Sequence, residues 1–220
     1  MDATQSVRIT VGDETVSGAF ARPAGAVATV VLAPGAGSSF DHPFLAGLCG
    51  ALNDAQVATL RFNFLYREAG RKLPDRAPKA IDAWRAAMTV ATDLSPGLPV
   101  WAGGKSFGGR MASMAVAAGM PAAGLVFIGY PLHPPGKPEK LRDEHLYGID
   151  RPMLFVQGTR DPFGSPAEFA PVVERIGTAT LRVIDGANHS FEVRGVPRPA
   201  AEVGAALAPA VAEFVRATGT

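Results

Sequence analysis

Residues Val100–Arg110 read V-W-A-G-G-K-S-F-G-G-R, and the organisation of the whole chain is easiest to follow from them. An apolar run comes first, then glycines on both sides of a serine, then small residues and helix formers through Ala118. This order is typical of a strand, a tight turn and a helix, with Gly104-x-Ser106-x-Gly108 at the turn. A serine there is held in a strained backbone conformation, so the residues two before and two after it must be very small.

A turn of this kind has chemical consequences. It lifts the Ser106 hydroxyl above the sheet and aims the backbone N–H of Phe107 at the point where an oxyanion would form. The beginning of the helix adds a dipole that favours developing negative charge. G-x-S-x-G is a weak pattern by itself, and a glycine-rich turn that happens to contain serine is the alternative interpretation.

Length and composition indicate one compact α/β domain over residues 1–220. The chain has 220 residues, 47% of them hydrophobic and 19% charged, which suits one sizeable core. The formal charge of +1 favours neither a nucleic acid nor an anionic membrane as partner. The only cysteine is Cys49, which excludes an intrachain disulfide and permits a reducing compartment. Residues 1–6 lack the pattern of a signal peptide, so we expect a cytoplasmic protein without membrane spans.

Predicted strands and helices alternate along the rest of the chain. This alternation predicts a single-domain, mostly parallel sheet of about eight strands with helices on both faces. The segment Gly129–Pro152 is too short for a large helical cap, so the site should be open. Pro209 should kink or split the C-terminal helix, and Asp41 could cap the first one. The predicted strands are Val7–Val11, Thr15–Arg22, Ala28–Ala33, Val57–Phe62, Val100–Ala102, Leu125–Ile128, Met153–Gln157 and Leu181–Ile184.

Reactive side chains follow three of these strands, in the order Ser106, Asp161 and His189. In sheets of this type the chemistry lies at the carboxyl ends of the strands. An imidazole can take the proton of a serine hydroxyl, and a carboxylate on its far side fixes the tautomer and stabilises the imidazolium. Serine, aspartate, histidine is also the chain order of the α/β-hydrolase triad. A fourth feature, the turn Pro34-Gly35-Ala36-Gly37, follows another strand, and its Ala36 N–H is our candidate for the second oxyanion donor.

From about Ala19 to Val215 the chain resembles the α/β-hydrolase superfamily, especially its small, lidless, dienelactone-hydrolase-like branch. The residues that carry the resemblance are Pro34–Gly37, Gly104–Gly109, Gly158–Asp161 and Asn188-His189. The G-K-S-F-G-G-R elbow is similar to one subgroup, in which some eukaryotic relatives look like subunits of chromatin complexes. Two departures matter: Pro34-Gly35 replaces the usual His-Gly, and the nucleophile is serine rather than the cysteine of dienelactone hydrolase or the aspartate of haloalkane dehalogenases.

Several further side chains are weighed against simpler structural roles. Arg61, Asn63, Lys105 and His133 lie near strand ends and are tentative substrate-binding residues, with a bracing ion pair or a plain loop residue as the alternatives. Asp150 and Asp143 compete with Asp161 for the acid, but Asp150 precedes its strand and Asp143 is expected in a helix. His145 is expected to be solvated, and His42 to lie on the surface or the substrate rim.

The resulting prediction is a serine hydrolase that cleaves carboxylic esters or thioesters of small acyl groups, with a small molecule as its partner. No cofactor is expected. A catalytic metal is not expected either, because no histidine pair has metal-ligand spacing. Two alternatives stay open: a non-catalytic binding or scaffold protein on the same fold, and an acyltransferase. The oligomeric state is left open too.

Overall fold

The computed structural model describes residues 4–219, whose strands form one eight-stranded sheet. The strand order is β1-β2-β4-β3-β5-β6-β7-β8. β1 and β2 form an antiparallel hairpin, β2 pairs antiparallel with β4, and all other neighbours are parallel. The predicted fold class is confirmed. The strands are β1 (Gln5–Val11), β2 (Glu14–Ala21), β3 (Thr29–Ala33), β4 (Ala58–Phe62), β5 (Val100–Lys105), β6 (Leu125–Ile128), β7 (Met153–Gly158) and β8 (Ala179–Ile184).

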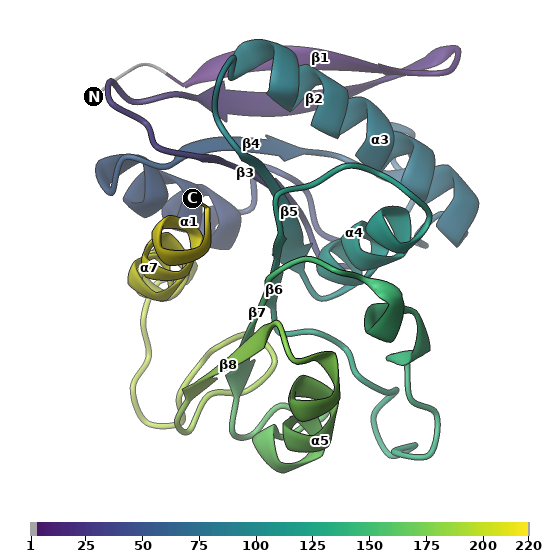
Figure 1. Ribbon diagram of the computed structural model, residues 1–220, viewed down its shortest axis with the longest axis vertical. Coiled ribbons are helices and arrows are strands. Elements are labelled where there is room, and N and C mark those ends of the chain that lie inside the picture. The colour runs from purple at the N-terminus through teal and green to yellow at the C-terminus, as the bar shows by residue number, and fades with distance from the viewer. Residues whose placement is uncertain (1–3, 220) are drawn as a thin grey trace.

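Helices cover both faces of the sheet (Figure 1). On one face lie α3 (Ala77–Leu94), α4 (Phe107–Ala117) and α5 (Pro166–Ile176); on the other lie α1 (Pro43–Asp54), α6 (Ala200–Ala205) and α7 (Ala208–Thr218). The remaining helical segments are α2 (Leu65–Glu68) and the 3-10 helix η1 (Glu144–Gly148). β6 and β7 are buried throughout, as a parallel sheet covered on both sides requires.

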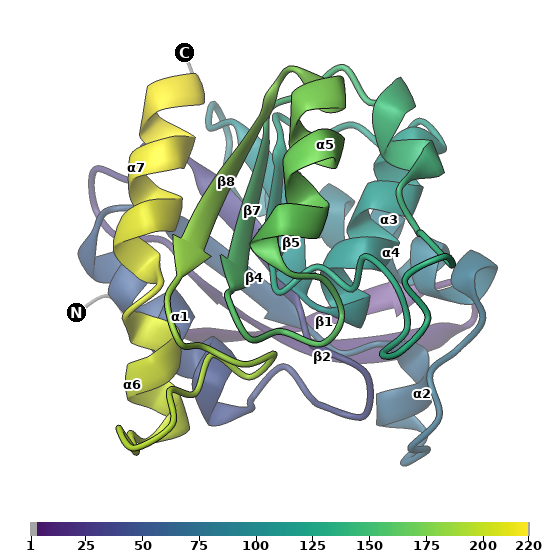
Figure 2. The ribbon, with the colours of Figure 1, turned by 90° about the horizontal axis from the view of Figure 1, so that it is seen from below.

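The two faces of the sheet bury separate apolar clusters. Trp84 and Phe127 belong to the cluster under α3 and α4, whereas Trp101 and Phe214 belong to the one under α1 and α7. Side chains alternate between faces along a strand, so neighbours such as Trp101 and Ala102 enter different clusters. Figure 2 shows that the loops after β3, β7 and β8 meet at one edge, the edge toward which the arrowheads of β7 and β8 point.

Three local expectations need correction. His42, not Asp41, caps α1: its Nδ1 accepts a hydrogen bond from the Phe44 N–H at 3.2 Å, while Asp41 accepts from the Ser39 hydroxyl at 2.5 Å. Asp143 is not inside a helix but precedes η1 as its N-cap residue. His145 is not simply solvated, because its Nε2 lies 2.8 Å from Ser113 Oγ.

The C-terminal helix is split, as Pro209 predicts. α6 ends at Ala205 and α7 begins at Ala208, which places Pro209 in the first turn of α7. Proline is tolerated there because the first N–H groups of a helix have no intrahelical acceptor.

Candidate active site

Ser106 lies between β5 and α4 in a left-handed backbone conformation, with φ 49° and ψ −112°. The glycines around it are required by close approach. A Cβ atom on Gly104 would lie 2.4 Å from the Ala33 carbonyl oxygen, and one on Gly108 would lie equally close to the same atom. No real Cβ tolerates such contacts with backbone, so the two glycines let the elbow sit against the end of β3.

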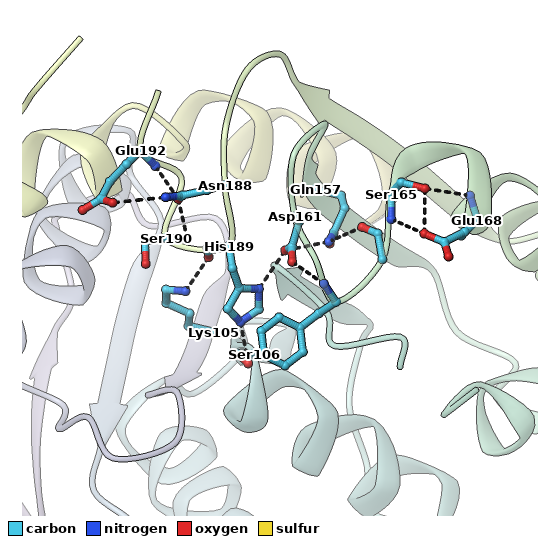
Figure 3. A network of polar contacts seen from close by, with 12 residues as sticks. Lys105, Ser106, Gln157, Asp161, Ser165, Glu168, Asn188, His189, Ser190 and Glu192 are labelled. Atoms are coloured by element: carbon cyan, nitrogen blue, oxygen red, sulfur yellow. Dashed lines mark hydrogen bonds and ion pairs between the residues drawn. The ribbon is translucent and has the colours of Figure 1, made fainter. Parts of the chain in front are cut away.

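The structure brings Ser106, His189 and Asp161 into one hydrogen-bonded chain (Figure 3). His189 Nε2 lies 2.9 Å from Ser106 Oγ, and His189 Nδ1 lies 2.7 Å from Asp161 Oδ2. Both distances are within hydrogen-bond range. The His189 side chain keeps 20% of its surface exposed, whereas the Asp161 side chain has none. The imidazole therefore lies between a hydroxyl open to substrate and a carboxylate shielded from water.

Asp161 is held by donors besides the histidine. Its Oδ1 accepts the Phe163 N–H at 2.9 Å, and its Oδ2 accepts from Gln157 Nε2 at 2.8 Å. Gln157 Nε2 also donates to the Gly164 carbonyl at 2.9 Å, so one buried amide ties the carboxylate to the turn that follows it. The Phe163 ring lies against the imidazole, with centroids 4.2 Å apart.

The loop that carries His189 is fixed from both sides. The Asn188 side-chain oxygen accepts the N–H groups of Ser190 and Glu192 at 2.8 and 3.0 Å. Across the loop, Lys105 Nζ donates to the His189 backbone oxygen at 2.8 Å (Figure 3). The residue before the nucleophile thus supports the base rather than pointing toward substrate.

In this position the ammonium group of Lys105 is largely removed from water. Its Nζ lies 5.6 Å from the centre of the Phe44 ring and 5.9 Å from that of Phe191. Burial lowers the pKa of Lys105 to about 8, although the carboxylates of Asp161 and Glu192 oppose this shift.

The turn after β3 lies against the elbow. A Cβ atom on Gly35 would be 3.8 Å from Ser106 Cβ. The Gly37 N–H donates to the Tyr66 hydroxyl at 3.0 Å, which ties this turn to α2. Within residues 4–219 the N–H groups of Ala36 and Phe107 have no hydrogen-bond acceptor. Both donors are therefore available to an incoming oxygen.

The other tentative residues are engaged elsewhere. Asn63 accepts the Phe40 N–H at 2.9 Å and donates to Glu68 at 2.8 Å, so it braces a loop. His133 is buried, and its Nε2 lies 3.2 Å from a Glu168 carboxylate oxygen.

Arg61 lies in β4 and shares a small cavity with Cys49 of α1. The cavity beside it, of about 120 Å³, contains no member of the Ser106 chain. The surroundings of Arg61, Asn63 and His133 therefore indicate structural roles. Of the four tentative residues, Lys105 is the one that contacts the His189 loop.

Sequence reasoning missed Gln157 and Tyr66. Gln157 was treated only as the end of a strand, yet it is the one polar side chain in the apolar run M-L-F-V-Q, which is a signal for a buried hydrogen bond. Tyr66 lies in α2, and no local sequence pattern connects it with Gly37, 29 residues earlier.

Within residues 4–219 no group of three His, Cys, Asp or Glu side chains could hold a metal ion. Nor does any helix in this part of the chain have the length and apolarity to cross a bilayer. An activated hydroxyl, a paired imidazole and two free N–H donors together suit nucleophilic attack on a carbonyl carbon.

Comparison with known proteins agrees with this chemistry. The family described as "Alpha/beta hydrolase domain" matches residues 26–216. Among solved structures, a dienelactone hydrolase from Anabaena variabilis is 25% identical and superposes with a TM-score of 0.80, covering 100% of this chain and 99% of the other. A lidless α/β serine hydrolase from Xanthomonas campestris is 20% identical with a TM-score of 0.74, covering 97% and 94%. Est1E from Butyrivibrio proteoclasticus, with ferulic acid bound, is 16% identical with a TM-score of 0.74, covering 96% and 99%.

Proposed function

Since the chain belongs to the alpha/beta hydrolase domain family, we propose that it is a serine hydrolase that cleaves carboxylic esters or thioesters of small acyl groups through an acyl-enzyme on Ser106. The chain is therefore an enzyme of the hydrolase type, and the proposal starts from this fact. The proposal adds the residues, the intermediate and the substrate class. The observation that supports it most directly is the unbroken chain from Ser106 through His189 to Asp161.

In the first half of the reaction, Ser106 Oγ attacks the acyl carbon while His189 Nε2 takes the hydroxyl proton. The carbonyl oxygen becomes an oxyanion that accepts the N–H groups of Phe107 and Ala36. Asp161 keeps the proton of His189 on Nδ1 and stabilises the imidazolium. Collapse of the intermediate expels the alcohol or thiol, which receives the proton from Nε2, and leaves the acyl group on Ser106.

In the second half, water takes the place of the leaving group. His189 removes a proton from the water as it attacks the acyl carbon, and the same two N–H groups hold the oxyanion again. Release of the carboxylic acid returns the proton to Ser106. The whole chain, residues 1–220, would act as one domain in this cycle.

Small acyl groups are favoured because nothing large covers the site. Between β6 and β7 the chain forms only η1, a 3-10 helix of five residues, where a cap would otherwise be inserted. The retained exposure of the His189 side chain fits a site that substrate reaches directly. The dienelactone hydrolase and the ferulic acid complex among the similar structures are in keeping with ester or lactone carbonyl chemistry.

A fluorophosphonate probe tests the proposal. We expect the folded protein to be labelled at Ser106, and we expect hydrolysis of 4-nitrophenyl acetate and butyrate. Ser106→Ala should abolish both signals. Ser190→Ala is the matched control, because Ser190 is exposed and next to His189 but its hydroxyl is not part of the hydrogen-bonded chain.

Absence of labelling in folded protein would count against the enzymatic proposal. It would favour the scaffold alternative if a stable protein partner is captured equally well by wild type and Ser106→Ala. Labelling together with faster release of the acyl group to an added alcohol than to water would favour the acyltransferase alternative.

A further inference from the structure

Two arginines beside the elbow helix have no partner of opposite charge. Arg110 lies on α4 and Arg142 just before η1, and both line a cavity of about 350 Å³. Within residues 4–219 neither guanidinium makes a hydrogen bond or an ion pair, and Arg110 Nε is buried without an acceptor. Other arginines also lack a carboxylate partner, and Arg61 and Arg67 likewise have a buried Nε without an acceptor, but Arg110 and Arg142 line one and the same cavity.

Both positive charges belong to the lining of this one cavity. Burial, and next the charge of Arg110, lower the pKa of Arg142. The same two causes lower the pKa of His145, which lines the cavity, to about 4, so this imidazole is neutral at pH 7. Two like charges held together are unfavourable unless an anion lies between them.

Among residues 4–219 no nearby carboxylate forms an ion pair with Arg110 or Arg142. Asp143 is engaged by the Tyr147 hydroxyl at 2.5 Å. Glu144 lines the cavity, but its carboxylate is not within ion-pair distance of Arg110 or Arg142.

Hydrogen bonds within the protein hold the residues that line the cavity in place. The Arg142 N–H donates to the Leu132 carbonyl at 2.8 Å, and the Arg142 carbonyl accepts from the Tyr130 hydroxyl at 2.7 Å. His145 is held by Ser113, on the same helix as Arg110. A guanidinium pair on fixed backbone suits an oxyanion, because each planar group offers parallel N–H donors to two oxygens.

The cavity is connected to the elbow through α4, the helix that carries Arg110 and begins directly after Ser106. The Arg110 N–H donates to the Ser106 carbonyl at 3.0 Å, so this arginine begins one helical turn after the nucleophile. Arg142 is connected to the site through Leu132, which accepts its N–H and lies beside Gly164, in the turn whose Phe163 ring contacts His189.

We propose that Arg110 and Arg142 form a subsite for an oxyanion, either a carboxylate or a phosphate group. The source of that group is an anionic end of the ester substrate or a free inorganic anion. The first source rests on the proposed function, whereas the subsite itself does not.

Direct binding is tested in Ser106→Ala protein, where no reaction intervenes. We expect inorganic phosphate, titrated calorimetrically at constant ionic strength, to bind, and binding to weaken about tenfold or more in Arg142→Met because charge-assisted hydrogen bonds are lost. Arg142→Lys, which keeps the charge, should lose less. Arg151→Met is the matched control, since Arg151 is exposed and remote from the cavity lining.

The source is tested with two esters of the same length, 4-nitrophenyl butyrate and mono-4-nitrophenyl succinate, and with the adipate monoester. If the substrate carries the anion, Arg142→Met lowers the ratio of kcat/KM for the charged over the neutral ester about tenfold. Phosphate binding that depends on Arg142 with an unchanged ratio supports the subsite with a free anion as its occupant.

No phosphate binding at millimolar concentration, together with an equal ester ratio in wild type and Arg142→Met, would overturn the proposal. Failure of both esters to react at all would instead contradict the proposed function. In that case the binding experiment in Ser106→Ala still decides whether the subsite exists.

Discussion

Lys105 Nζ lies 2.8 Å from the backbone oxygen of His189, so the residue that precedes the nucleophile holds the loop that carries the base. This bond joins the end of β5 to a loop 84 residues later. It gives the ammonium group a positioning role, because it reaches the imidazole only through the backbone of His189.

Replacing Lys105 should therefore lower kcat more than it raises KM. In Lys105→Met we expect kcat to fall roughly ten- to a hundredfold, because small displacements of a catalytic base are costly, with KM changed less than about twofold. Lys140→Met is the control, since Lys140 is exposed on the surface. Steady-state kinetics on a neutral ester measure both. An unchanged kcat in folded Lys105→Met would remove Lys105 from the positioning of the base.

The same ammonium should make stability depend on pH. The folded pKa of Lys105 is about 8 against an ordinary value of 10.5. Between these values the unfolded chain binds more protons than the folded one, so this group makes the free energy of unfolding rise with pH.

Denaturant unfolding of wild type and Lys105→Met, from pH 7 to pH 10.5, isolates this contribution. We expect the wild type to gain stability relative to the variant as pH rises above about 8, and the difference to be constant below it. A difference that is flat across the whole range would show that the ammonium is not desolvated.

Asp161, and neither of its rivals, should be required for fast turnover. Asp161→Asn removes the acceptor that keeps the His189 proton on Nδ1, and we expect kcat to fall by about 10²–10⁴. Asp150→Asn is the matched variant, because Asp150 is exposed and precedes β7. Equal losses in the two variants would be incompatible with the triad.

Gln157→Leu should impair both stability and turnover. The change takes one donor from Asp161, which keeps its bonds to His189 and the Phe163 N–H, and removes the Gln157 donor from the buried Gly164 carbonyl; a buried acceptor left unpaired costs about 1–3 kcal/mol. Asn53→Leu is a matched control: Asn53 also donates to two acceptors, Val57 O and Thr59 Oγ1, but away from the triad. It should lose stability while the folded protein keeps its kcat. Similar kcat values for both variants would contradict a role of Gln157 in holding Asp161.

The elbow glycines should be far less tolerant of a side chain than Gly50, a helical glycine with open space around it. Gly108→Ala would place a Cβ 2.4 Å from the Ala33 carbonyl oxygen, and we expect a loss of about 1–3 kcal/mol with lowered activity. Gly50→Ala, at an exposed position of α1, meets nothing within 4 Å and should stabilise by up to about 1 kcal/mol. Thermal unfolding of both variants provides the comparison, and equal midpoints would argue against the close approach.

The parts that were predictable depend on neighbours in sequence. Gly104 and Gly108 predict the elbow because a tight turn excludes side chains at those spacings. Apolar runs such as Leu125–Ile128 predict strands that are buried on both faces. Ser106, Asp161 and His189 could be grouped because parallel strands deliver their carboxyl ends to one edge.

The directions of side chains were not predictable in the same way. Arg61 and Lys105 both come from the carboxyl-terminal parts of strands, yet one lines a cavity with Cys49 of α1 and the other reaches the His189 loop. Asn63 and His133 are occupied by Glu68 and Glu168, partners that sequence position alone does not indicate.

Backbone sterics and the period of apolar residues act over a few positions, so the strands, the elbow and the order of the catalytic groups can be read along the chain. Hydrogen bonds between distant segments depend on how the layers pack. The support of Asp161 by Gln157, the tether from Lys105 and the unpaired guanidinium groups of Arg110 and Arg142 therefore exist only in the folded arrangement, where burial determines which polar groups must find partners.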